Sequence, residues 1–320
     1  MRALITGASR GLGRSIAREF FHHGASLALV ARSGAALHEF AAELRGTGDG
    51  GRGTGDGSRA GLATEAVGLA TEAAGPATEA VGPATEAAGT GDGSVVVIPA
   101  DLRDPQAPAA IVDQLRGHWD HLDVLVNNAA TTGPIGPVWD NDWREWQETI
   151  QVNLLAPVAL CRACIPWMRP GGAIVNLSGG GATSPRANFS AYGTAKAALA
   201  RFTETLAIEA AALGIRVNAI APGVMNTEMT EAVLRAGPEK AGADYAKSLE
   251  VQRHGGESPE KAAALAYYLA SEASEGITGR LISAVWDPWP ALGDRAAELR
   301  GSDIYTLRRI VPEDRGKRWT

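Results

Sequence analysis

A glycine-rich segment near the start of the chain has residue types and spacing that suggest chemistry. It reads Thr6-Gly-Ala-Ser-Arg-Gly-Leu-Gly13 and stands between a short apolar run and a helical pattern. The first glycine permits a tight turn, the second lets the backbone approach a pyrophosphate, and the third allows close packing, while free N–H groups at the helix start would bind phosphate oxygens. At a first strand-to-helix turn, this spacing favours a dinucleotide site over a purely structural turn. The residues assigned to that site are Gly7, Ser9, Arg10, Gly11, Leu12 and Gly13.

The end of the second predicted strand, residues 27–31, indicates which dinucleotide is bound. Arg32 and Ser33 follow this strand, where an acidic residue would accept a hydrogen bond from the ribose 2′-hydroxyl of NAD. A guanidinium instead favours a 2′-phosphate, and Arg10 adds a second cation nearby. We therefore expect NADP(H) to be preferred over NAD(H). The alternative is that Arg32 is only a solvated surface charge.

A tyrosine and a lysine four residues apart, Tyr192 and Lys196, could transfer a proton. On a helix this spacing places both side chains on one face, one turn apart. A free phenol titrates near about 10, which is too high for efficient proton transfer at neutral pH. A nearby ammonium and an oxidised nicotinamide would both favour the phenolate and lower its pKa. The pair is common in proteins, so its position after a dinucleotide motif and five strands gives it meaning.

Short apolar strands alternate with helical patterns outside residues 46–94, and these elements must position the residues above. Such strands are typical of a parallel sheet covered on both faces by helices. The sequence therefore predicts an α/β fold, a Rossmann-type doubly wound parallel sheet forming a single domain. The helix predicted at about 142–168 contains Pro157, which we expect to bend it. Strands are predicted at 3–6, 27–31, 95–98, 124–126, 174–177, 217–221 and 281–285, and the other helices at 12–23, 35–45, 109–117 and 191–213.

Residues 46–94 form a low-complexity insertion in the crossover between the second and third strands. They contain 14 of the 39 glycines, seven acidic residues and two basic ones, and they repeat a seven-residue unit. Glycine and proline in these units disfavour a helix, so we expect a disordered surface loop, with partner binding as the alternative. The domain is thus predicted to comprise residues 1–45 and 95–290, followed by a C-terminal extension at 291–320.

Charge and composition exclude several classes of protein. The chain has a net charge of −6, and the insertion accounts for −5 of it, so a nucleic-acid partner is not expected. No stretch approaches 18 uninterrupted apolar residues, so neither a transmembrane helix nor a membrane partner is expected. The chain runs from Met1 straight into the first strand and the glycine turn, so we expect no signal peptide. Cys161 and Cys164 fit a reducing cytoplasm, and we expect them in the core rather than in a redox or metal site.

Taken together, these motifs resemble those of the classical short-chain dehydrogenase/reductase family. The resemblance covers residues 1–45 and 95–290. It rests on Thr6–Gly13, Asp101-Leu102, Asn127–Ala130, Asn153, Tyr192 with Lys196, and Pro222–Thr227.

The resemblance implies roles for individual residues. Tyr192 would be the general acid/base, and Lys196 would bind the nicotinamide ribose and lower the Tyr192 pKa. Asn153 would hold a water molecule in the proton relay. The adenine would lie between Asp101 and Leu102, Asn128 would support the cofactor backbone, and Val224 and Thr227 would contact the nicotinamide carboxamide. The cofactor site implied by these motifs also includes Ala129, Pro222 and Gly223.

One position departs from the family pattern. The family places a catalytic serine about 13 residues before the tyrosine, where this chain has Gly179. Ser178 lies one residue earlier, and neighbours on a strand point to opposite faces. The glycines at 179–181 could let the backbone turn Ser178 into the site, and this is the assignment we favour. Otherwise a backbone N–H or another hydroxyl must polarise the substrate carbonyl, the candidates being Thr183, Ser184 and Ser190.

The substrate loop and the extension are less informative. The substrate loop is expected near 228–255, where Met225, Met229 and Leu234 either line it or only pack. The extension is expected to pack on its own or a neighbouring subunit, near the substrate cleft. A helical run carries Trp139, Trp143 and Trp146, which we expect to be core or interface anchors rather than a stacking platform.

These observations predict a cytoplasmic NADP-dependent oxidoreductase that interconverts a secondary alcohol and a ketone. The resemblance implies a homodimer or homotetramer. Two alternatives stay open: an NADP-binding regulatory or sensor protein without turnover, and an epimerase or dehydratase that uses the nicotinamide transiently.

Overall fold

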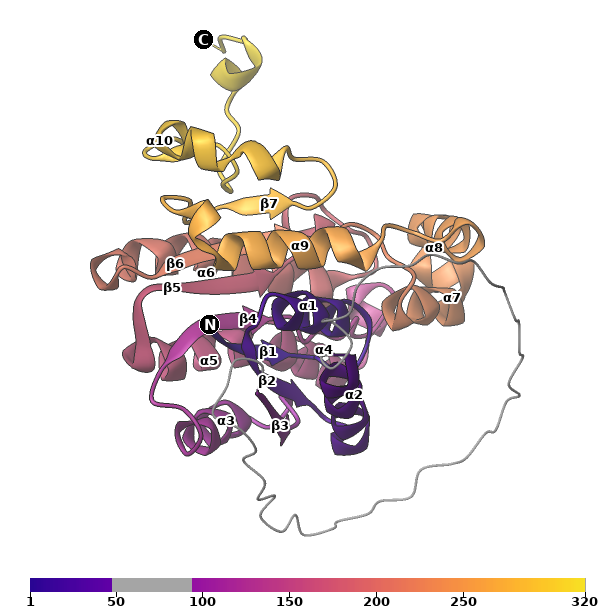
Figure 1. The fold of residues 1–320 in the computed structure, drawn as a ribbon. Helices are drawn as coiled ribbons and strands as arrows, with labels where there is room; N and C mark the ends of the chain where they lie inside the picture. The colour runs from indigo at the N-terminus through magenta and orange to yellow at the C-terminus, as the bar shows by residue number, and fades with distance from the viewer. Residues whose placement is uncertain (48–93, 320) are drawn as a thin grey trace, which may run out of the picture.

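A seven-stranded parallel sheet forms the centre of the protein in a computed structural model that describes residues 1–47 and 94–319 (Figure 1). The strand order is β3-β2-β1-β4-β5-β6-β7, and every neighbouring pair is parallel. This confirms the predicted doubly wound sheet. The predicted insertion lies outside the described residues apart from its first two and its last. The strands are β1 (Arg2–Thr6), β2 (Ser26–Ala31), β3 (Val95–Pro99), β4 (Leu122–Asn127), β5 (Met168–Leu177), β6 (Arg216–Ala221) and β7 (Leu281–Ser283).

Helices cover both faces of the sheet because successive strand residues point to opposite sides. In β1, Ala3 and Ile5 belong to a core beneath α1 (Gly11–His22), α2 (Gly34–Thr47) and α9 (Pro259–Ala270). Leu4, between them, belongs to a second core beneath α3 (Ala107–Arg116), α5 (Ala156–Cys164) and α6 (Ser190–Glu209). The strands are therefore apolar on both faces, which explains their continuous hydrophobic runs. Two further helices, α7 (Glu228–Ala241) and α8 (Ala243–His254), lie together at one end of the molecule (Figure 1).

The long helical run predicted around Pro157 contains a change of helix type. It consists of α4 (Trp143–Ile150), a π-helical turn (Gln151–Leu155), α5 and a 3-10 turn (Ile165–Trp167). Pro157 lies in the first turn of α5 and has no N–H to donate to the carbonyl of Asn153, four residues earlier. The chain widens into the π turn directly before the proline. The irregularity thus falls at Asn153 and not at the proline itself.

The same run bears on two expectations. Cys161 and Cys164 are buried in the core, as predicted, and burial raises the pKa of the Cys161 thiol to about 12. By length and composition alone, the described stretch Trp143–Trp167 could cross a membrane, although 39% of its most apolar window is buried within the protein. A core helix of a soluble protein passes the same test, and the cysteines show that this helix packs against the sheet.

The C-terminal extension packs on its own chain, beyond the edge strand β7 (Figure 1). The backbone N–H of Leu281 donates to the carbonyl of Tyr305 at 2.8 Å. Arg280 donates to the carbonyls of Leu299, Ser302 and Ile304. These bonds cover the open edge of β7, which would otherwise present unpaired backbone groups.

The tryptophans expected to anchor a core or an interface differ in burial. Trp139 and Trp143 are 82% and 64% exposed, so neither is a core residue. Trp146 is partly buried, stacks on Trp143 at 5.1 Å and donates from its indole Nε1 to the hydroxyl of Ser190. It therefore links α4 to the start of α6.

Candidate active site

The candidate site lies where the strands end, because all seven strands are parallel and their carboxyl ends share one edge of the sheet. The glycine segment follows β1, Arg32 follows β2 and Asp101 comes soon after β3. Asn128 follows β4, Ser178 follows β5 and Pro222 follows β6. The strand order reverses between β1 and β4, the place where open parallel sheets bind ligands.

The glycine segment has the backbone that its sequence predicts. Gly7 and Gly11 have φ values of +68° and +51°, in the left-handed region that favours glycine. A Cβ on Gly13 would overlap the carbonyl oxygen of Gly7 and the side-chain amide of Asn128. A Cβ on Gly11 would meet only the Thr227 methyl group, at 3.9 Å. The helix N-terminus is therefore packed closely from below and left open above, as a bound pyrophosphate requires.

Asn128 and Ala129 support the glycine segment from the end of β4. The Asn128 side-chain amide donates to the carbonyls of Thr6 and Gly7, at 2.8 and 3.2 Å. In return, the Thr6 hydroxyl accepts from the backbone N–H groups of Asn128 and Ala129, at 3.0 and 3.1 Å. These bonds join the first and fourth strands across the switch point.

At the end of β2, Arg32 and Ser33 are exposed, and the Ser33 hydroxyl accepts from the backbone N–H of Ala36 at the start of α2. Arg10, the second expected cation, instead forms an ion pair with Glu228 at the start of α7. In this structure Arg10 thus connects the glycine segment to the predicted substrate loop.

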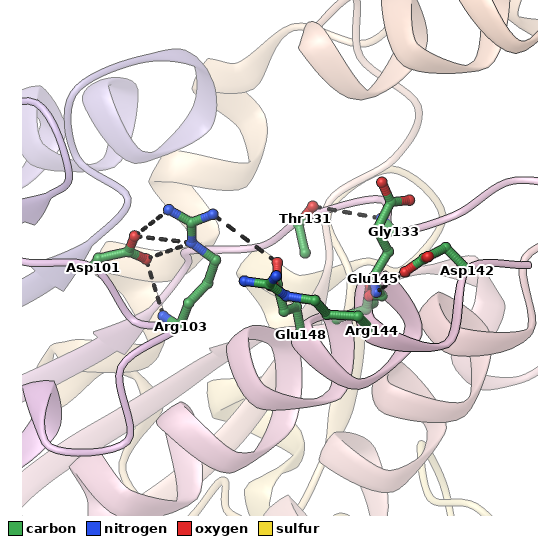
Figure 2. Close-up of polar contacts among 9 residues, drawn as sticks. Asp101, Arg103, Thr131, Gly133, Asp142, Arg144, Glu145 and Glu148 are labelled. Carbon is green, nitrogen blue, oxygen red and sulfur yellow. Dashed lines mark hydrogen bonds and ion pairs between the residues drawn. The ribbon is translucent and has the colours of Figure 1, made fainter. Parts of the chain in front are cut away.

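The two residues expected to flank the adenine differ in burial, since Asp101 is half-buried and Leu102 is buried. Asp101 forms an ion pair with Arg103, which also lies 4.0 Å from Glu148 (Figure 2). Partial burial works to raise the pKa of Asp101, but hydrogen bonds from Arg103 and the charges of Arg103 and Arg32 outweigh it and lower that pKa. The side chain of Leu102 is buried in the second core, so mainly its backbone remains to face the adenine.

The segment after β6 returns toward the glycine segment. Gly223 has a φ of +90°, and a Cβ there would lie 2.7 Å from Val285. Its neighbour Pro222 is partly exposed, and the side chain of Val224 is 59% exposed. The Val224 carbonyl accepts from the backbone N–H of Glu257 at 2.8 Å. Val224 is thus fixed by its backbone while its side chain stays free for contact.

Tyr192 and Lys196 lie on the first turns of α6 and are both buried. The Lys196 ammonium donates to the carbonyl of Leu177 at 2.6 Å and lies 5.7 Å from the centre of the Tyr192 ring. Burial lowers the pKa of Lys196 to about 8. Burial also raises the pKa of Tyr192, and the charge of Arg186 partly opposes this. The surroundings of Tyr192 therefore do not by themselves produce the lowered pKa that the sequence led us to expect.

Asn153 is fully buried in the π turn. Its side-chain oxygen accepts from the Thr131 N–H and its amide donates to the Thr131 carbonyl, both at 2.8 Å. Figure 2 shows the loop of Thr131 and Gly133 that this pairing holds. Because both ends of the side chain are bonded to Thr131, the backbone carbonyl of Asn153, which receives no α-helical hydrogen bond from Pro157, is the candidate group for holding a water molecule.

The structure does not turn Ser178 toward Tyr192, contrary to our expectation. The Ser178 N–H donates to the Ile220 carbonyl at 2.8 Å, so strand pairing continues through this residue and the alternation of faces is kept. Its hydroxyl donates to the carbonyl of Lys196 at 3.2 Å. A Cβ on Gly179, by contrast, would lie 3.3 Å from the Tyr192 hydroxyl. The position facing Tyr192 is therefore 179, which carries no side chain.

The other candidate hydroxyls lie around the outer side of α6. Thr183, Ser184 and Ser190 line a cavity of about 400 Å³, together with Gly193 and other residues that do not include Tyr192 or Lys196. The Ser190 hydroxyl also accepts from the Trp146 indole. None of these three hydroxyls is therefore observed beside the Tyr192 oxygen.

Apolar side chains surround Tyr192, and the sequence identified only one of them. Met229 belongs to this group, whereas Met225 packs against the first core and Leu234 is outside both. The residues of this group that the sequence analysis did not identify come from four separate segments, and no local spacing connects those segments. The cluster consists of Phe189, Tyr192, Val233 and Ala241, with the partly buried Ile135, Met229 and Tyr245 against it.

Arg186 was also missed. Its guanidinium lies 3.8 Å from the centre of the Phe189 ring and 5.7 Å from that of Tyr192. Its Nε donates to Asp244 of α8 at 3.0 Å, and Lys247 lies 4.0 Å from the same carboxylate. This ion pair connects the loop before α6 to the predicted substrate loop, which folds as α7 and α8.

Two family models match the chain. One, described as enoyl-(acyl carrier protein) reductase, matches residues 62–284, and one described as short chain dehydrogenase matches residues 1–53. "Oxidoreductase UcpA" of Escherichia coli K12 is 30% identical over 286 residues, which cover 87% of this chain and 90% of that protein. Human "Dehydrogenase/reductase SDR family member 4" is 37% identical over 163 residues, and the match spans only 57% of that protein and 50% of this chain.

Solved structures share the fold. A putative short-chain alcohol dehydrogenase from Sinorhizobium meliloti 1021 is 29% identical, with a TM-score of 0.64, and the match covers 88% of this chain and 94% of that one. A short-chain type dehydrogenase/reductase from Mycobacterium marinum is 27% identical, with a TM-score of 0.65 and coverage of 88% and 92%.

Proposed function

The chain belongs to the short-chain dehydrogenase/reductase family of NAD(P)-dependent oxidoreductases, and from this we propose that it interconverts a secondary alcohol and a ketone with NADP(H). The observation that carries the proposal is the buried pair Tyr192 and Lys196, with the Tyr192 hydroxyl at the edge of the sheet where the glycine segment opens.

The residues present fit a nicotinamide dinucleotide. Gly7, Gly11, Ser9, Leu12 and Gly13 form the open helix start, which would hold the pyrophosphate. Arg32 and Ser33 are exposed, and no acidic residue directly follows β2 in the sequence, so they would hold the 2′-phosphate, which supports NADP over NAD. When bound, the nicotinamide donates or accepts a hydride at the substrate carbon.

The chain itself supplies the proton. Tyr192 would hold it on the phenol oxygen and pass it to the substrate oxygen during reduction, or remove it during oxidation. Lys196, charged below a pKa of about 8, would stabilise the phenolate and bind the ribose. The Asn153 carbonyl would hold the water molecule that returns the proton from solvent.

The test is to measure oxidation of NADPH and of NADH with a panel of ketones. Wild-type protein should turn over with NADPH in preference to NADH. Tyr192→Phe should lower kcat by at least about 100-fold while NADPH still binds. Tyr267→Phe is the matched control, since Tyr267 stacks on His23 at 3.9 Å, in contact with α1 and not with the site. Turnover that survives in Tyr192→Phe would reject the mechanism.

One observation favours a second function, an NADP-binding sensor without turnover. Position 179 lacks a hydroxyl beside Tyr192, and loss of one such donor costs about 100-fold or more in rate. The same assay separates the two functions, because a sensor binds NADPH but consumes none with any ketone.

Assembly and location also remain proposals. We propose a homodimer or homotetramer formed through the helical run that leads into α5 and through α6, where Leu155 of the π turn and Ile208 of α6 are 48% and 79% exposed. A small-molecule substrate and a cytoplasmic location complete the proposal.

A further inference from the structure

Gly179 is not required by its own backbone. It follows Ser178 with φ 167° and ψ 176°, an extended conformation that any residue can adopt. A Cβ there would lie 3.3 Å from the Tyr192 hydroxyl, closer than ordinary van der Waals contact. A Cβ on the next residue, Gly180, would meet nothing within 4 Å. Glycine at 179 therefore keeps a side chain from crowding the Tyr192 oxygen.

Apolar side chains pack with Tyr192 in one cluster. Phe189 and Val233 are fully buried against Tyr192, and Met229 and Ile135 pack on the same cluster. The nearest hydroxyl in sequence, that of Ser178, donates to the backbone of α6. The surroundings of the Tyr192 side chain therefore suit an apolar group better than a polar one.

We propose that Gly179 determines substrate specificity: it admits an apolar branch on the carbon next to the substrate carbonyl, so the preferred substrates are branched, apolar ketones. This inference rests on the proposed function. In the reaction, a hydride from NADPH forms the new C–H bond at the carbonyl carbon, and the C=O π electrons move to oxygen. That oxygen takes the proton of Tyr192, so the ketone is reduced to the alcohol and NADPH is oxidised to NADP⁺.

The experiment compares two ketones that differ only in branching, butan-2-one and 3,3-dimethylbutan-2-one, with NADPH as reductant. Gly179→Ala restores a Cβ without a hydroxyl. It should lower the ratio of kcat/KM for the branched over the unbranched ketone by at least about tenfold, the effect of one misplaced methyl-sized group in an apolar pocket. Gly179→Ser should lower the same ratio and also raise kcat for butan-2-one, because it adds a hydrogen-bond donor beside the substrate oxygen.

Gly180→Ala is the matched control and should leave the ratio at the wild-type value. NADPH titration of every variant shows whether the cofactor site has folded. An unchanged ratio in a Gly179→Ala protein that binds NADPH and reduces butan-2-one overturns the specificity inference alone. If Gly179→Ala does not fold, the ratio in Gly179→Ser decides in the same way. If wild-type protein binds NADPH but reduces neither ketone nor any of the panel, the proposed function fails, and this inference fails with it.

Discussion

Arg186 should set the pH at which Tyr192 works. Its guanidinium lies 5.7 Å from the centre of the Tyr192 ring, and its charge opposes the rise that burial causes in the Tyr192 pKa. At an effective dielectric constant of about 20, a unit charge at that distance favours the phenolate by about 3 kcal/mol, or about 2 pH units. Asp244, bonded to Arg186 at 3.0 Å, cancels much of this field. We therefore expect a net contribution of about 0.5–1 pH unit.

The assay is the pH dependence of kcat for alcohol oxidation, in which the phenolate is the base. Arg186→Gln removes the favourable charge, so the Tyr192 pKa should rise and the ascending limb should move to higher pH. Asp244→Asn removes the cancelling charge, so the limb should move to lower pH. Arg186→Lys keeps the charge and should stay near the wild-type profile.

These opposite shifts separate electrostatics from packing. Arg186 also covers the Phe189 ring, so loss of packing alone would lower kcat without moving the two limbs in opposite directions. Thermal unfolding and NADPH affinity of each variant provide the folding control. Profiles of Arg186→Gln and Asp244→Asn that both coincide with that of the wild type would refute the reasoning.

Two further predictions concern Lys196 and Gly13. The pKa of Lys196 is about 8 in the folded chain against an ordinary 10.5, so between these values the unfolded chain binds more protons and wild-type stability should rise with pH. Lys196→Met should abolish turnover. It should also raise the free energy of unfolding at pH 7 by up to about 3 kcal/mol, and the rise of that free energy above pH 8 should become flatter. Denaturant titrations that show destabilisation of this variant at pH 7 would contradict the prediction. A Cβ on Gly13 would overlap the Gly7 carbonyl, so Gly13→Ala should destabilise the fold by about 1–3 kcal/mol and weaken NADPH binding at least tenfold. Gly46→Ala, where a Cβ meets nothing within 4 Å, is its control in fluorescence titrations, and equal NADPH affinity of the two variants would count against the role of Gly13.

The fold could be predicted because its signals are local. Strands such as β1 are continuous apolar runs, since both faces of the sheet are covered, and helix α1 begins at Gly11, one residue before its predicted start. Pro157 likewise predicted an irregular helix. The irregular turn lies before the proline because Pro157 has no N–H to donate to the Asn153 carbonyl. We did not draw this consequence from the sequence.

The candidate site also has some features that the local sequence predicts and others that depend on contacts between elements. The glycine segment and the Tyr192–Lys196 pair depend on backbone conformation and on spacing within one helix, which the sequence carries by itself. The direction of Ser178 depends on the strand pairing of its N–H with Ile220, and three glycines in a row give no local signal for either outcome.

From the sequence alone follow the fold class, the family resemblance, the turn of the glycine segment and the placement of Tyr192 and Lys196 on one helix. Only the tertiary structure decided which position faces the Tyr192 hydroxyl, which side chains surround it, and which charge lies beside it. Gly179, Val233 and Arg186 come from separate segments, and Asp244 approaches Arg186 only because α8 packs beside the loop before α6. The physical reason is that spacing along a chain determines neighbours within an element, whereas neighbours between elements are set by packing.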